Sequence, residues 1–227
     1  IRLYTGAETM RYPIGEVFNL AQLNQPLPST IIQEQIMEGV HIYSLGKGTS
    51  MSPEAFGFYK MLFVKQGKMR ITIKDERGIP HMQELNKYDG IVTPTGRVIV
   101  LEALEDAVYL EVMLGQTVNH TIKEIGEVFS TAALGEYKKN EMALVNVISS
   151  GFVDVTIVCF DQNGCVFERE LTRNIMIFGY EGEGLVEVDG KKQILKPDDS
   201  LRIMRGSHIR MYPTTGQLKI GLTNFYI

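Results

Sequence analysis

The sequence has 227 residues, of which 44% are hydrophobic and 22% are charged, a balance typical of globular proteins and not of disordered or fibrous ones. The formal net charge is −4 and the isoelectric point is about 5.7. Because basic residues form no stripe, we expect no nucleic-acid partner. No apolar stretch reaches the roughly 18 residues that a membrane-spanning helix needs, so we expect no membrane partner either.

Strand patterns dominate the chain. Residues 68–74 alternate strictly between polar and apolar and end at the turn-forming residues 75–78, which predicts a hairpin. Residues 185–188 run into Asp189-Gly190, a dipeptide favoured in tight hairpin turns because both positions tolerate positive φ. Further strands are predicted, in chain order, at residues 98–104, 108–114, 153–160, 175–180 and 218–227, and short helices at residues 8–12, 20–24 and 131–137.

An internal repeat is the strongest signal in the sequence. Residues 14–23, IGEVFNLAQL, reappear as residues 125–134, IGEVFSTAAL, with seven of ten positions identical. Weaker matches, at offsets of 110 to 115 residues, join residues 85–89 to 195–199, Gly67 to Gly182 and Gly96 to Gly206. The repeat predicts two homologous domains, one over residues 1–118 and one over residues 119–227, joined near residues 115–121.

The two cysteines, Cys159 and Cys165, flank a turn-like Gln-Asn-Gly segment. They are able to face one another across a hairpin, or to remain two free thiols. We favour free thiols, because small disulfide-stabilised secreted domains use more cysteines than this. We therefore expect a cytoplasmic protein.

Both halves resemble the cupin family. The resemblance rests on a strand that ends in a glycine before an alternating strand (FVKQG at 63–67, FGYEG at 178–182), then a turn, a Leu-x-x-x-Asp step and a Pro-x-Gly-like loop. It covers residues 14–114 and 125–227 and implies an all-β protein of two tandem antiparallel β-barrels of the cupin jelly-roll type, internally duplicated. Faces shared between the halves, or between the chains of a homodimer, would cover the exposed sheet edges.

The resemblance also implies where a divalent metal would sit, through the motifs G-x5-H-x-H-x3,4-E-x6-G and G-x5-P-x-G-x2-H-x3-N. Laid over the N-terminal half, the four ligand positions fall on Glu54 and Phe56 (or Pro53 and Ala55), Lys60 and Ile99. In the C-terminal half they fall on Arg169 and Leu171 (or Glu168 and Glu170), Ile175 and Ile209. No position carries the residue type that the family uses, so we expect no metal or other cofactor unless an atypical metal site exists.

Lys60 and Glu54 are the candidate ligand-binding residues of the N-terminal half. If the overlay holds, both side chains point into the barrel, and a buried ammonium is costly unless paired, which predicts a contact between them. Such a pair is suited to bind a carboxylate or phosphate, or to serve as acid and base. The alternatives are an inert pair or a surface position for Lys60.

In the C-terminal half the candidates are Arg169 and His208. A guanidinium binds a carboxylate through two parallel hydrogen bonds, so Arg169 is suited to anchor an acidic ligand, although a solvated strand end is the alternative. His208 precedes the last ligand position by one residue. Strand alternation therefore points it outward, unless a bulge reverses the faces.

Two functions remain open at this point. The first, which we favour, is a metal-free binding or scaffold protein that holds a small apolar or acidic molecule inside a barrel. The second is a cupin enzyme, an isomerase, dioxygenase or decarboxylase, that uses an atypical metal site or Lys60 and Glu54 as acid and base.

Overall fold

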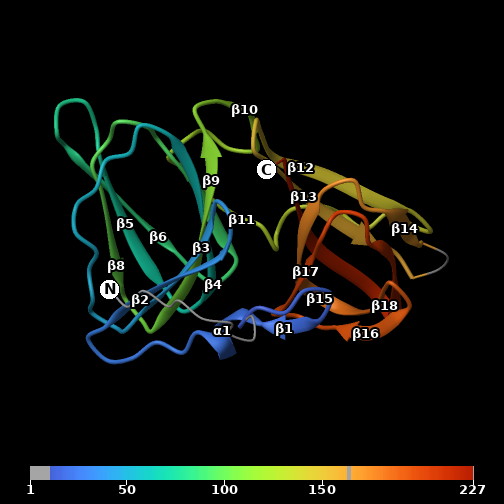
Figure 1. The fold of residues 1–227 in the computed structure, drawn as a ribbon. Helices are drawn as coiled ribbons and strands as arrows, with labels where there is room; N and C mark the ends of the chain where they lie inside the picture. The colour runs from blue at the N-terminus through green and yellow to red at the C-terminus, as the bar shows by residue number, and fades with distance from the viewer. Residues whose placement is uncertain (1–10, 163–164, 227) are drawn as a thin grey trace.

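The computed structural model describes residues 11–162 and 165–226 and consists almost entirely of antiparallel strands (Figure 1). Residues 11–117, the N-terminal half, contain β1 (Val17–Asn19), α1 (Leu20–Leu23), β2 (Ile31–Met37), β3 (Val40–Leu45), β4 (Tyr59–Gln66), β5 (Met69–Lys74), β6 (Pro80–Leu85), β7 (Asp89–Thr93), β8 (Ile99–Ala103) and β9 (Ala107–Gly115). Residues 118–226, the C-terminal half, contain β10 (Val118–Thr121), β11 (Val128–Ser130), β12 (Met142–Ser150), β13 (Val153–Phe160), β14 (Phe167–Glu170), β15 (Asn174–Val188), β16 (Lys191–Leu195), β17 (Asp199–Ile203) and β18 (His208–Phe225).

The strands form three sheets. In the N-terminal half, a six-stranded sheet of order β11-β7-β4-β9-β3-β2 accompanies a three-stranded sheet of order β6-β5-β8. In the C-terminal half the long strands β15 and β18 carry one sheet of order β1-β17-β15-β18-β13-β12-β10, to which β14 and β16 add at the sides. The all-β class is confirmed. Within the described residues, however, hydrogen bonding does not close either half into a continuous barrel.

The sequence patterns located β5, β8, β9, β13, β15 and the end of β18, and missed many of the other strands. The hairpin expected after residues 68–74 joins β5 to β6, and Asp189 and Gly190 turn β15 into β16 with φ values of 49° and 85°. The helix expected at 20–24 is α1, and residues 8–10 of another expected helix lie outside the described residues. Residues 131–137 form no helix. Thr131 is instead tied to the other half, because its backbone N and its Oγ1 both donate to the carbonyl oxygen of Tyr88.

The two repeated segments exchange places. Strand β1 of the N-terminal half pairs with β17, with Asn19 opposite Asp199, and β11 of the C-terminal half pairs with β7, with Ser130 opposite Asp89. The two pairings have the same direction and corresponding registers. Each segment therefore extends a sheet of the opposite half, and the segment expected to be a linker also joins a sheet, as β10 on β12.

Three apolar clusters stabilise this arrangement. One lies inside each half, and the third contains side chains of both halves and packs the two together. At its centre the rings of Phe63 and Phe178, from equivalent positions of the two halves, lie 5.7 Å apart between centroids. Because burial of apolar surface is the main favourable term in folding, the junction is part of the core and not a loose contact.

A buried lysine lies in the junction. Lys65 is 3% exposed, and among the described residues its Nζ finds no hydrogen-bond partner. The ammonium faces the rings of Phe63, Tyr88 and Phe178 at 4.8 to 5.7 Å. Burial lowers the pKa of Lys65 to about 8, and the charges of Asp198 and Asp199 oppose that shift only in part.

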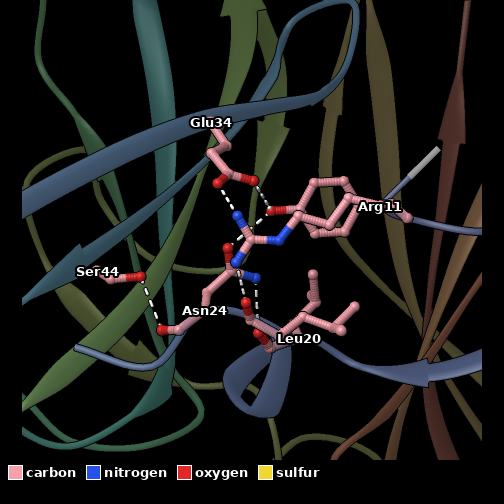
Figure 2. A network of polar contacts seen from close by, with 7 residues as sticks. Arg11, Leu20, Asn24, Glu34 and Ser44 are labelled. Atoms are coloured by element: carbon pink, nitrogen blue, oxygen red, sulfur yellow. Dashed lines mark hydrogen bonds and ion pairs between the residues drawn. The ribbon is translucent and has the colours of Figure 1, made fainter. Parts of the chain in front are cut away.

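A polar network anchors the segment that precedes β1 (Figure 2). The Tyr12 hydroxyl lies 2.7 Å from both Asn24 Oδ1 and Glu34 Oε2, and Arg11 pairs with Glu34. The buried Asn24 also donates through Nδ2 to the carbonyl oxygen of Leu20 and accepts a hydrogen bond from Ser44. These bonds hold the segment before β1 against α1 and strands β2 and β3. In the described part of the chain, no helix is long and apolar enough to cross a membrane.

Candidate functional site

The four positions that the motif overlay assigns to the N-terminal half meet in one small pocket. Glu54 and Phe56 come from the loop before β4, Lys60 from the start of β4, and Ile99 from the start of β8. The remaining walls are apolar at Met51, Leu62 and Leu101 and polar at Ser52, Thr93 and Glu111 of β9. The first of the two alternative placements, on Glu54 and Phe56, is therefore the one that converges.

Lys60 does point into this pocket, but its partner is Glu111 and not Glu54. The Nζ atom lies 2.6 Å from Oε1 of Glu111, and the two side chains are 9% and 12% exposed. Strands β4 and β9 are neighbours with Leu62 opposite Glu111, which brings the carboxylate beside the ammonium. Glu54 pairs through its backbone with Ile99 while its side chain stays exposed at the rim.

Aromatic rings surround the charged pair. The Lys60 ammonium lies 3.2 Å from the centroid of Phe56 and 5.5 Å from that of Phe58, an arrangement that favours a cation. Next to the pocket, Tyr43 and Tyr109 stack with centroids 4.9 Å apart, and the Tyr109 hydroxyl donates to the sulfur of Met51. Burial, with the nearby negative charges, raises the pKa of both phenols, so both stay neutral at physiological pH.

The pocket is nearly filled in this conformation. Its free volume is about 20 Å³, which is enough for about one water molecule. The Phe56 ring, which lies over Lys60 and belongs to a loop, is part of this lining. An organic ligand needs more room than one water molecule, so part of the lining must move before it enters.

The residues present do not fit the divalent metal that the fold family implies. Phe56 and Ile99 carry no donor atom, and the protonated Lys60 has no lone pair to give. Two carboxylates remain, one of which, Glu111, is already bound to Lys60. No group of three or more His, Cys, Asp or Glu side chains suited to a metal occurs in the part of the chain that the structure describes.

The C-terminal half carries apolar residues at the corresponding places. Ile175 pairs with Ile203 as Lys60 pairs with Thr93, and Leu222 opposes Ile177 as Glu111 opposes Leu62. Ile175 and Leu222 are buried in the apolar interior. The polar pair of the N-terminal half thus has no counterpart in the other half.

Arg169 and His208 lie on the outside of the C-terminal half. Arg169, on β14, donates to Asn224 Oδ1 at 3.3 Å and stacks on Phe167. The His208 side chain is 52% exposed and lies 3.4 Å from Glu168, as strand alternation indicates. The structure therefore brings Glu54 and Lys60 to one pocket but not Arg169 and His208, and a ligand role for each of the four stays a prediction.

Glu111 is the residue that sequence reasoning missed. The signal was present, since Glu111 is the only charged residue in the apolar run at 108–114. A lone carboxylate in a central strand requires a buried partner.

Comparison with solved structures identifies the fold as that of the cupin proteins. A cupin 2 conserved barrel domain protein from Leptotrichia buccalis superposes with a TM-score of 0.82 at 17% identity, over 94% of this chain and 97% of that one. Oxalate decarboxylase from Lactobacillus farciminis, in its formate complex, gives 0.57 at 11% identity, over 92% and 85%. Oxalate decarboxylase from Bacillus subtilis, whose description refers to Mn(II) centres, gives 0.54 at 12%, over 94% and 78%. No protein-family model and no curated protein sequence matches the chain.

Proposed function

We propose that this chain is a tandem cupin that binds a small molecule in the pocket of its N-terminal half without a divalent metal. The observation that carries the proposal is the Lys60–Glu111 pair, which occupies the place where the cupin motif has its ligands. A buried charged pair is costly to maintain, and an apolar pair serves the same position in the C-terminal half. Retention of charge in one half only is the pattern expected of a binding site.

The tandem organisation, with domains over residues 1–118 and 119–227, has its own support. The repeated segments β1 and β11 pair with β17 and β7 in corresponding registers. Gly67 and Gly182, matched in the sequence, both adopt positive φ, at 75° and 74°. These correspondences are what duplication of one ancestral half produces.

The pocket favours a ligand with an apolar body and one acidic or polar end. Met51, Leu62 and Leu101 provide an apolar wall, and the body of the ligand takes the place of the Phe56 ring. An ammonium has three donors, and Glu111 uses one of those of Lys60, so oxygen atoms of the ligand have donors left to bind. Glu54 at the rim disfavours a second negative charge at the outer end.

Ligand-induced thermal stabilisation, measured over a panel of small carboxylic acids and neutral metabolites, tests this site. At least one compound is expected to raise the melting temperature of the wild type and to lose that effect in Lys60→Met. The double variant Lys60→Ile, Glu111→Leu copies the C-terminal half and keeps the interior satisfied. Lys74→Met removes an exposed lysine of the same half and serves as the matched control. Stabilisation that survives in both pocket variants contradicts the proposal.

Metal content tests the other part of the proposal. Protein purified without chelators is expected to contain much less than one metal ion per chain. One tightly bound Fe, Mn, Ni or Zn per chain contradicts it. The enzyme alternative, with Lys60 and Glu54 as acid and base, gains no support, because Lys60 is paired with Glu111.

We also propose a cellular compartment and an oligomeric state. Cys159 and Cys165 are both free and buried, which suits a reducing compartment such as the cytoplasm. A homodimer stays part of the proposal because edge strands such as β2 have an open side. Light scattering coupled to size exclusion measures the assembly directly.

A further inference from the structure

A second cavity, formed by residues quite different from those of the Lys60 pocket, opens on the C-terminal half. It has a volume of about 340 Å³, and we call it the arginine cleft; its lining is Thr172, Arg173, Asn174, Arg205, Phe225 and Tyr226. Cavities of this size accommodate small organic ligands. Phe225 is only 2% exposed, so the open space holds two guanidinium groups and one accessible ring, that of Tyr226.

The two loops that carry the arginines are fastened to each other. The backbone N of Gly206 donates to the carbonyl oxygen of Leu171, and the backbone N of Leu171 donates to that of Ser207. In addition, the backbone N of Arg205 donates to Asn174 Oδ1 at 3.0 Å. These bonds fix the spacing of the two loops before any ligand arrives, which reduces the entropic cost of binding.

Arg173 is oriented by an aromatic ring. Its guanidinium carbon lies 3.9 Å from the centroid of Tyr226. Tyr226 is itself anchored, because its backbone N donates to Phe152 and its hydroxyl donates to Asp154. Stacking holds the plane of the guanidinium without consuming its N–H donors, so the donors remain for an anion.

Positive charge accumulates around the cleft. Throughout residues 11–162 and 165–226, neither Arg173 nor Arg205 has a carboxylate within ion-pair distance. Arg169, on β14 four residues before Arg173, adds a further positive charge, and burial and then the charge of Arg173 lower its pKa. Among the described residues, Asp154 accepts hydrogen bonds from Tyr226 and Ser149, and Glu170, two residues before Thr172, is exposed.

From this geometry we propose that the arginine cleft binds a small organic anion, through a carboxylate or phosphate group held by Arg173 and Arg205. A guanidinium presents paired N–H donors that match both groups. The apolar part of the ligand packs on the exposed ring of Tyr226. This site is independent of the Lys60 pocket, because the two share no residue.

Titration with phenyl phosphate and with benzoate at low salt, followed by NMR chemical shifts, tests the proposal. Benzyl alcohol, which has the ring but no charge, is the ligand control. Saturable shifts of the Thr172, Asn174 and Tyr226 amides are expected with at least one anion. Tighter binding of phenyl phosphate assigns the phosphate class, and tighter binding of benzoate assigns the carboxylate class. The absence of saturable binding of either anion, or equal binding of benzyl alcohol, overturns the proposal.

Variants locate the binding. Arg173→Gln and Arg205→Gln are each expected to weaken it by about tenfold or more, and Arg173→Lys by less, because it keeps the charge but loses the planar fork. Arg210→Gln is the matched control, since Arg210 is an exposed arginine of β18 near Glu168 and outside the cleft. Thermal melting verifies that each variant is folded. Undiminished affinity in the double variant Arg173→Gln, Arg205→Gln overturns the proposal, and unchanged affinity in Lys60→Met separates it from the proposed function.

Discussion

Tyr88 of the N-terminal half donates a hydrogen bond to Asp198 of the C-terminal half, and the two residues occupy matching positions of the sequence repeat. Lys87 reaches the same carboxylate at 2.7 Å. One of the polar contacts between the two halves is thus made by residues at matching positions of the sequence repeat, a phenol and a carboxylate. Near it lies the ammonium of Lys65, 5.7 Å from the centroid of the Tyr88 ring and, within the described residues, without a hydrogen-bond acceptor.

Removal of that ammonium is expected to stabilise the protein at neutral pH. Lowering a pKa from 10.5 to about 8 corresponds to a penalty of about 3 kcal/mol on the charged form. Below pH 8 Lys65 is protonated in both the folded and unfolded states, so the full penalty applies. Lys65→Met is therefore expected to raise the free energy of unfolding at pH 7, by up to that amount, in urea titrations.

The free energy of unfolding of the wild type should depend on pH because of Lys65. Between pH 8 and pH 10.5 the folded state has released the proton that the unfolded state still holds, so the stability of the wild type rises with pH. The advantage of Lys65→Met should shrink over this interval, while Lys74→Met, at an exposed lysine, shows no such trend. An advantage that stays constant from pH 7 to pH 10.5 contradicts this account.

A double-mutant cycle on Lys60 and Glu111 measures the coupling in the pocket. Each single change, Lys60→Ile or Glu111→Leu, leaves one buried charge unpaired and is expected to cost about 3–5 kcal/mol. The double change places the residue types of Ile175 and Leu222 in the N-terminal half. It should cost much less than the sum of the two single changes, and strict additivity in urea unfolding refutes the coupling.

Two constraints require glycine at position 67, a positive φ and a close backbone contact, and Gly48 shares only the first. Its φ is 75°, and a Cβ atom there would lie 2.1 Å from the carbonyl oxygen of Asp106. Gly48 has a similar φ, 79°, but open space around the Cβ position. Gly48→Ala is expected to cost about 1–2 kcal/mol from backbone strain alone, and Gly67→Ala about 2 kcal/mol more from the clash. Equal costs in chemical denaturation would show that the backbone at Asp106 moves away freely.

Unfolding of the two halves is expected to be a single event, because one apolar cluster contains side chains of both. Ile71→Ala opens a cavity in the separate cluster of the N-terminal half and should cost about 2–5 kcal/mol. Cys165, in the separate cluster of the C-terminal half, reports on the other side in a Cys159→Ala background. Its rate of thiol labelling under mild denaturant should rise by the factor that corresponds to the same free energy. An unchanged rate means that the halves unfold separately.

Local sequence patterns predicted the positions of several strands and turns. They did not predict which strands pair across the two halves. The strand at residues 153–160 and the turn at Asp189 depend on alternation and backbone preference, which are local. That β1 pairs with β17 of the opposite half depends on contacts across 180 residues or more, on which the local pattern has no bearing.

The candidate site divides in the same way. The motif spacing placed Glu54, Phe56, Lys60 and Ile99 in one pocket, although they come from a loop and from strands β4 and β8 of two different sheets. The partner of Lys60 depended on the register of β9, which spacing alone does not give. The arginine cleft escaped notice because Arg173 and Arg205 belong to separate loops that only the folded chain brings together.

Because β1 and β11 are exchanged, each half completes a sheet of the other half. If the chain were cut near residue 116, the fragment before the cut would still fill the edge beside β17, and the fragment after it the edge beside β7. Neither fragment alone presents a finished sheet edge or a covered junction. Two such fragments, expressed together, should therefore reassemble into one particle and be purified as a pair.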